Sequence, residues 1–267
     1  MKPSSFSVIC TNSSAHELKG LLLSLSIFHT GVNVYIISDN ETKLYIENMC
    51  QYKDLTIHIK WFVELDKYTN MNRSMMEKEG IFTEFLNNKA IVIKKALNYE
   101  KDTLLLDCDI VITDVIDNID ETASLGVSPH FIKQQYIHDV GYYNAGMLWT
   151  NTMEVVNDWI EFNKISRYFE QASIEELVKK YKYFEFGENY NLQCWRYLLS
   201  VEPSEKIKSH ITSTENDKLY YKNEPLKCVH THFLDERFKE FNNIIIQHLQ
   251  NAKMYNIIKI IKIVMVK

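Results

Sequence analysis

The 267-residue chain has the composition of a folded globular protein, with 46% hydrophobic and 24% charged residues. A chain of this length can bury roughly three-quarters of its unfolded surface around one or two cores. Seven glycines and four prolines exclude collagen-like and linker-rich sequences. The formal net charge of −5 argues against nucleic acid as a partner, because nucleic acid is a polyanion.

Cysteine usage and the N-terminal residues bear on the compartment. The five cysteines are Cys10, Cys50, Cys108, Cys194 and Cys228. An odd number without a CxxC pair argues against a disulfide framework and a structural zinc site, and fits a reducing compartment. The first residues lack the apolar segment of a secretory signal, and no apolar run is long enough to span a membrane. We therefore expect a cytoplasmic protein.

Apolar runs of strand length alternate with segments of helical spacing in the first half of the chain. In chain order, the expected strands cover residues 6–11, 32–38, 55–62 and 103–106, and the expected helices cover residues 15–29 and 82–97. This alternation favours a doubly wound α/β sheet, whose ligands bind outside the carboxyl ends of the strands. We expect residues 1–240 to form one domain and residues 241–267 a C-terminal tail.

Two carboxylates interrupt a core strand. The apolar run 103–106 leads directly into Asp107, Cys108 and Asp109, and a second apolar run follows. Burying unpaired carboxylates costs several kcal/mol, so a cation or hydrogen-bond donors should face them. Strand alternation places Asp107 and Asp109 on one face, where they could chelate a hard divalent metal. The alternative is a pair of aspartates that cap a turn.

Three further features carry polar chemistry. Lys89 falls within the apolar stripe of the helix 82–97, so it needs an anionic partner or must extend to solvent. The segment 141–146, GYYNAG, indicates a tight bend that enters a strand at Met147. His230 and His232 would share one face of a strand, and either could complete a mixed nitrogen and oxygen site suited to Mn²⁺. Each feature also has a purely structural interpretation.

The segment LLLDCDIVI resembles the DxD segment of nucleotide-sugar-dependent glycosyltransferases of the GT-A fold, in particular the retaining glycogenin-like family. GYYNAG and VHTHF are similar to further segments of that family. The resemblance implies a single Rossmann-like GT-A domain with a mostly parallel sheet and a helical tail. It also implies Mn²⁺ or Mg²⁺ as cofactor, a nucleoside-diphosphate sugar donor, with UDP the expected nucleotide, and a glycan, protein or lipid acceptor.

The resemblance implies roles for individual residues. The donor-binding residues would be Thr11, Asn12, Asp39, Lys89, Asp107, Cys108, Asp109, Asn144, Ala145, Gly146 and Asn191. The metal ligands would be Asp107, Asp109 and His232, with His230 as the alternative. His232 is favoured because His232-Phe233-Leu234 is similar to the family's His-Phe-Leu-Gly, although Asp235 replaces the glycine and the family's following Lys-Pro-Trp is absent.

The reacting centre has further candidates. Asp109 would act in catalysis. Inversion of configuration would require a carboxylate base, for which Asp139 or Glu188 would serve. The resemblance favours retention. Gln193 could face the sugar, and Tyr190 and Trp195 could stack on a sugar or pack in the core. Two other functions fit the motif. One is a phosphatase-like hydrolase with Asp107 as nucleophile, and the other is a GT-A-like domain that binds a glycan or a partner without turnover.

The tail differs in character from the rest of the chain. Residues 242–267 carry lysines and isoleucines at helical spacing, and no acidic residue follows Glu240. A basic amphipathic helix of this kind could contact an anionic membrane surface. Alternatively, its apolar face could pack against its own domain or a partner subunit.

Overall fold

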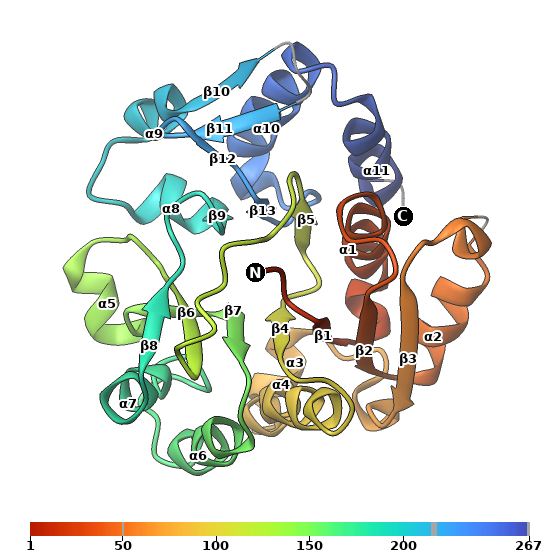
Figure 1. Ribbon diagram of the computed structural model, residues 1–267, viewed down its shortest axis with the longest axis vertical. Coiled ribbons are helices and arrows are strands. Elements are labelled where there is room, and N and C mark those ends of the chain that lie inside the picture. Colours follow the sequence, from red (N-terminus) through yellow and green to blue (C-terminus); the bar gives the residue numbers. More distant parts are fainter. Residues whose placement is uncertain (50, 215–217, 266–267) are drawn as a thin grey trace.

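A computed structural model describes residues 1–49, 51–214 and 218–265. In this part of the chain a seven-stranded sheet runs through the molecule (Figure 1). Cys50 and the last two residues of the predicted tail lie outside the described residues. The strands are β1 (Ser5–Cys10), β2 (Asn33–Ser38), β3 (His58–Val63), β4 (Thr103–Leu106), β6 (Leu125–Pro129), β7 (Tyr143–Thr150) and β8 (Tyr183–Glu185). They follow the order β3-β2-β1-β4-β7-β6-β8.

Strand directions confirm the predicted α/β class with a mostly parallel sheet. β3, β2, β1 and β4 are parallel, whereas β7 runs antiparallel to both β4 and β6, and β8 is parallel to β6. The parallel strands β1, β2 and β4 lie where the apolar runs predicted them. β7 begins at Tyr143, earlier than expected, because the bend is completed at Gly141 with φ of +96°. Asn144 and Gly146 therefore lie within a buried strand.

Helices cover both faces of this sheet, because alternate strand residues point to opposite sides. Tyr35 and Ile37 belong to a core cluster to which α4 (Phe82–Leu97), α6 (Met153–Asn163) and α7 (Ile174–Lys180) also contribute. Val34 and Ile36 pack instead with α1 (Ala15–Phe28). The shorter helices α2 (Asn40–Glu47), α3 (Arg73–Lys78) and α5 (Gln134–Val140) complete this part of the chain.

A second layer of structure continues from the end of β4. Its first sheet has the order β5-β13-β9, with β5 (Ile110–Ile112), β13 (Cys228–His230) and β9 (Leu192–Gln193). Its second sheet comprises β10 (Ile211–Thr214), β11 (Lys218–Tyr221) and β12 (Glu224–Pro225), next to α8 (Cys194–Leu199) and α9 (Ser204–His210). Because β13 pairs with β5, residues near 230 are brought beside the segment that follows β4.

The C-terminal helices α10 (Lys239–Asn251) and α11 (Tyr255–Met265) pack against the rest of the protein. The buried residues of α11 are Ile257, Ile258, Ile260, Ile261 and Val264. Figure 1 shows α11 beside α1, and the approach is close, because a Cβ added at Gly20 would lie 2.5 Å from Val264 Cγ2. The apolar face of the predicted tail therefore packs on its own domain. No helix among the described residues is long and apolar enough to cross a membrane.

Candidate functional site

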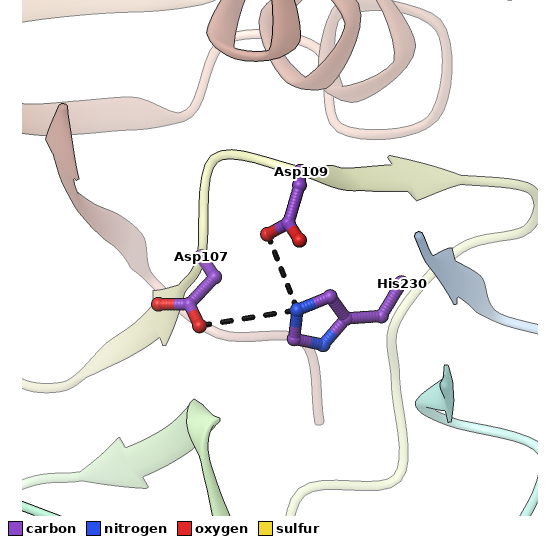
Figure 2. Close-up of side chains that lie close together, drawn as sticks. All are labelled: Asp107, Asp109 and His230. Carbon is purple, nitrogen blue, oxygen red and sulfur yellow. Dashed lines mark ion pairs between the residues drawn. The ribbon is translucent and has the colours of Figure 1, made fainter. Parts of the chain in front are cut away.

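Two aspartates and a histidine converge at the carboxyl end of β4. Asp107 directly follows β4, Asp109 precedes β5, and His230 ends β13. One ligand atom from each of these side chains lies within 4.8 Å of the other two. Figure 2 shows one ring nitrogen of His230 facing both carboxylates. This nitrogen, Nε2, lies 3.2 Å from Asp109 Oδ1 and 3.9 Å from Asp107 Oδ2. We call these three residues the Asp–Asp–His group.

A hydrogen-bond network fixes the His230 ring. Its Nδ1 lies 3.2 Å from Asn191 Oδ1, while the Asn191 amide nitrogen donates to Ser128 Oγ at 3.0 Å and to Asn144 Oδ1 at 3.1 Å. The donations to Ser128 and Asn144 identify the nitrogen end of the amide, so its oxygen accepts from His230 Nδ1–H. The lone pair of Nε2 is then directed toward the aspartates, as a metal-binding imidazole requires.

His232 lies at the margin of the Asp–Asp–His group. Its Nδ1 is 2.9 Å from Glu17 Oε1, and its Nε2 is 3.4 Å from Asp109 Oδ2. The resemblance favoured His232 as the metal ligand, whereas the described structure gathers His230 with the two aspartates. Glu17, which the sequence analysis did not find, orients His232 in the way that Asn191 orients His230.

Gly146 permits this convergence. A Cβ at this position would lie 2.5 Å from His230 Cε1 and 2.6 Å from Asp107 Oδ2. Such contacts are too short for any side chain. The Asn144 amide oxygen accepts from Gly146 N at 3.0 Å, so the backbone role that was open for Asn144 is present.

Lys89 is buried among three acceptors. Its Nζ lies 2.7 Å from Asp107 Oδ1 and 2.9 Å from Glu170 Oε1, and it donates to Ala145 O at 3.3 Å. Burial alone would lower the pKa of Lys89, but the charges of Asp107 and Glu170 outweigh it and raise the pKa above its ordinary value. Glu170 was not predicted, because no local sequence pattern relates it to Lys89.

The site opens into a cavity of about 580 Å³. The Asp–Asp–His group, His232 and Lys89 line it together with Thr11, Cys108, Asn144, Glu17, Glu170 and Trp195. Asn12 and Asp39 do not line it. Asp39 accepts from Thr42 N at 2.7 Å at the start of α2 and from Asn12 N at 2.9 Å. Their geometry is therefore that of a helix cap and a loop anchor.

The two proposed bases lie elsewhere. The Asp139 side chain is 73% exposed and faces His138, and Glu188 pairs with Lys222 at 2.9 Å and Arg196 at 3.7 Å. Neither lines the cavity. The structure therefore does not bring either carboxylate opposite the Asp–Asp–His group, because their elements carry them to the surface or into other ion pairs.

The remaining sequence candidates have structural partners. Gln193 is buried, and its Oε1 lies 2.8 Å from His130 Nδ1; Tyr190 donates from its hydroxyl to Asp117 O at 2.9 Å. Asp235, which replaces the family's glycine, accepts from Arg237 N at 2.9 Å and pairs with the Arg237 guanidinium. Arg237 in turn lies 5.4 Å from the centre of the Trp195 ring, at the edge of the cavity.

The carboxylates and histidines of the site shift one another's pKa values. Burial would raise the pKa of Asp109, but His230 and His232 outweigh it and hold that pKa below its ordinary range. Burial would lower the pKa of His232, but Glu17 and Asp109 raise it to about 9. Burial would also lower the pKa of His230, but Asp109 and Asp107 raise it. Protons on the two histidines therefore offset part of the carboxylate charge. When both histidines are deprotonated, as metal ligation requires, Asp107, Asp109, Glu170 and Lys89 together carry two net negative charges. A divalent ion would balance them.

Comparisons with known proteins locate the fold. No protein-family model and no curated protein matches the chain. Among solved structures, galactosyltransferase LgtC, in complex with donor and acceptor sugar analogs, matches with a TM-score of 0.53 and 13% identity, over 90% of this chain and 95% of that one. Mouse xyloside xylosyltransferase 1 matches with a TM-score of 0.54 and 12% identity, over 85% of this chain and 97% of that one.

A third match is the bifunctional glycosyltransferase WbbM, with a TM-score of 0.55 and 10% identity, over 96% of this chain. This chain spans only 52% of the WbbM chain, about half its length. At such low identity the comparisons bear on architecture alone. The chain has the α/β fold of GT-A glycosyltransferases.

Proposed function

We propose that this protein is a metal-dependent glycosyltransferase, which moves a hexose or pentose from a nucleoside-diphosphate sugar, UDP-sugar first, to a glycan, protein or lipid acceptor. The observation that carries the proposal is the Asp–Asp–His group, which lies at the carboxyl end of β4 in a cavity of about 580 Å³. In an α/β sheet this is the edge where ligands bind. The similarity to solved glycosyltransferases supports the same interpretation.

The residues present fit a divalent ion. Two carboxylates and one imidazole within 4.8 Å form a mixed oxygen and nitrogen donor set, which suits Mn²⁺, with Mg²⁺ as the alternative. Asp107, Asp109 and His230 would hold the ion, and His232 lies close enough to Asp109 to join or replace His230. A bound ion would supply neutralisation of the leaving nucleoside diphosphate.

The lining of the cavity supports a donor site on the same face. Thr11, Cys108 and Asn144 line it and would contact the nucleotide and the sugar. Among the described residues, the other carboxylates that line the cavity are Glu17 and Glu170, and both are engaged in ion pairs. This supports retention of configuration, since inversion requires a carboxylate that is free to accept a proton.

A thermal-shift experiment tests the proposal. The protein is heated with UDP, GDP, CDP, ADP or dTDP, each with and without Mn²⁺. A nucleotide at a hundred times its Kd stabilises the folded state by about 2.7 kcal/mol. We expect a shift for UDP that requires Mn²⁺ and that Asp109→Asn abolishes. Asp139→Asn is the matched control, because it removes an equal charge outside the cavity. No shift with any nucleotide would overturn the proposal.

A further inference from the structure

Glu170 lies beside the proposed metal site without belonging to the Asp–Asp–His group. Its carboxylate is buried, lines the cavity and pairs with Lys89 at 2.9 Å. Its backbone carbonyl accepts from Trp159 Nε1 at 2.9 Å and from Ser173 Oγ at 2.7 Å. Phe169, immediately before it, has φ of +42°, which is rare for a bulky residue. The backbone is thus anchored in a strained turn that presents Glu170 to Lys89.

The ammonium of Lys89 has no hydrogen-bond donor to spare. A lysine ammonium carries three N–H donors. Within hydrogen-bond distance of Lys89 Nζ lie Asp107 Oδ1, Glu170 Oε1 and Ala145 O, all of them protein atoms. The resemblance implies that Lys89 binds the donor. In this arrangement, however, Lys89 has no N–H group left to donate to a diphosphate. Its charge instead acts on Asp107.

The two oxygens of Asp107 therefore have different surroundings. Oδ1 is held by Lys89 at 2.7 Å, while Oδ2 faces His230 Nε2 at 3.9 Å. A carboxylate fixed in this way offers one oxygen to a cation, in a set orientation. Residues that orient a ligating carboxylate through hydrogen bonds tune metal affinity in the same way as those that orient a ligating histidine.

Stability alone does not account for this ion-pair cluster. Removing charges from water carries a penalty that mutual attraction often does no more than offset, and apolar residues of similar volume often serve the fold as well. Without Glu170, the buried Lys89 charge would face Asp107 alone and would compete more strongly for it. Glu170 therefore shares the positive charge of Lys89 and leaves Asp107 available to a cation.

We propose that Glu170 is a positioning residue for the metal site, which acts through Lys89 to set the orientation and charge of Asp107. The inference rests on the metal site of the proposed function. In Glu170→Gln the buried group would lose one negative charge, and Lys89 would draw more strongly on Asp107. Both effects weaken the binding of a divalent cation.

Mn²⁺ binding, measured by the loss of the free-ion electron paramagnetic resonance signal, tests this role independently of transfer. The titrations use Mn²⁺ alone and Mn²⁺ with saturating UDP on the wild type, Glu170→Gln, Glu170→Asp and Glu176→Gln. Glu176 pairs with Lys179 at 2.6 Å on the surface, so Glu176→Gln is the matched control. We expect about a 10- to 100-fold weaker Kd for Glu170→Gln, an intermediate value for Glu170→Asp, and the wild-type value for Glu176→Gln.

The outcomes separate the two proposals. If the wild type binds no Mn²⁺ under either condition, the proposed metal site is wrong. If the wild type binds Mn²⁺ and folded Glu170→Gln binds it within twofold of the wild type, the role of Glu170 is overturned while the metal site stands. Should Glu170→Gln fail to fold, Glu170→Asp decides: a wild-type Kd overturns the role, because the shorter side chain cannot keep its contact with Lys89.

Discussion

Two lysines of this protein are each buried between two carboxylates, in regions with different tasks. Lys89 on α4 lies between Asp107 and Glu170 and lines the cavity. Lys227, directly before β13, lies 3.1 Å from Asp114 Oδ2 and 3.0 Å from Asp117 Oδ1, and it does not line the cavity. Burial would lower the pKa of either lysine, and the paired carboxylates raise both.

The difference lies in what surrounds the carboxylates. Around Lys227, the backbone N–H groups of Thr113 and Asp114 donate to Lys227 O, so the ion pairs tie the end of β5 to the start of β13. Around Lys89, one carboxylate also turns its second oxygen toward His230. The same residue pattern therefore holds two chain segments together in one place, and in the other it orients an oxygen of Asp107 toward the proposed metal site. The charges of the residues alone do not distinguish the Lys89 cluster from the Lys227 cluster.

The largest expected effect concerns the region of Lys89, where Asp109 belongs to the Asp–Asp–His group. Asp109→Asn removes the carboxylate that lies nearest His230, and it should lower kcat by about a hundred- to a thousandfold. The measurement is the release of nucleoside diphosphate from the donor that the thermal shift selects. Stability in urea should also fall, because Asp109 is the buried partner of His230 and His232, and its lowered pKa shows that the charged form stabilises the fold. Turnover is therefore compared on folded protein. Undiminished turnover would refute the assignment of Asp109.

Lys227→Met should act on stability and not on metal binding. The substitution leaves Asp114 without its buried partner. We expect the free energy of unfolding to fall by about 3 kcal/mol. This is the lower end of the range for breaking a buried ion pair, because Asp117 is partly exposed. Urea denaturation measures this loss. The Mn²⁺ affinity of the folded variant should equal that of the wild type; a tenfold change would mean that the two lysine sites are coupled.

Gly146→Ala tests the close approach at the proposed metal site. The added Cβ would meet His230 Cε1 and Asp107 Oδ2, so the side chains must move apart. We expect a Kd for Mn²⁺ up to about 100-fold weaker. As a control, Gly31→Ala adds a methyl group with no neighbour within 4 Å, and any loss there reflects only its positive φ. Wild-type Mn²⁺ binding by Gly146→Ala would show that this contact does not shape the site.

The smallest expected effect is a pH dependence near the Lys227 site. His29 Nε2 accepts from Ile116 N at 3.0 Å, and burial, with the charge of Lys2, lowers the pKa of His29 to about 4. The unfolded chain, with a histidine pKa near 6.5, then binds more protons below neutral pH, so stability falls as the pH falls. We expect a loss of about 1 kcal/mol between pH 7 and 5.5. His29→Gln should remove this part of the slope in urea denaturation, whereas an unchanged slope would exclude His29 as its source.

The sequence predicts this fold best where the information is local. β1, β2, β4, α1 and α4 follow from apolar runs and helical spacing, and Asp107 and Asp109 follow from charge at the end of a core strand. The sequence does not decide between His230 and His232, because both lie on one face of the extended segment. Only the pairing of β13 with β5 gives the two histidines different positions. Glu17 and Glu170 could not be predicted as site residues, because their partners His232 and Lys89 lie far away in the sequence.

The tail illustrates a second limit. Its amphipathic pattern indicates that an apolar face must be covered, but not by what. In the structure this apolar face packs against α1, where the missing side chain of Gly20 makes room for Val264. Asp139 and Glu188 were chosen by residue type and loose resemblance, and tertiary structure directs both away from the cavity.

The contact between α1 and α11 has a consequence for biosynthesis. α11 is translated more than 200 residues after α1, which takes roughly 10–45 s at ordinary elongation rates. Until then, the surface around Gly20 that receives Ile260 and Val264 has no cover. We therefore expect the nascent chain to depend on chaperones during this interval, and to complete the core beneath α1 only after synthesis of residue 265.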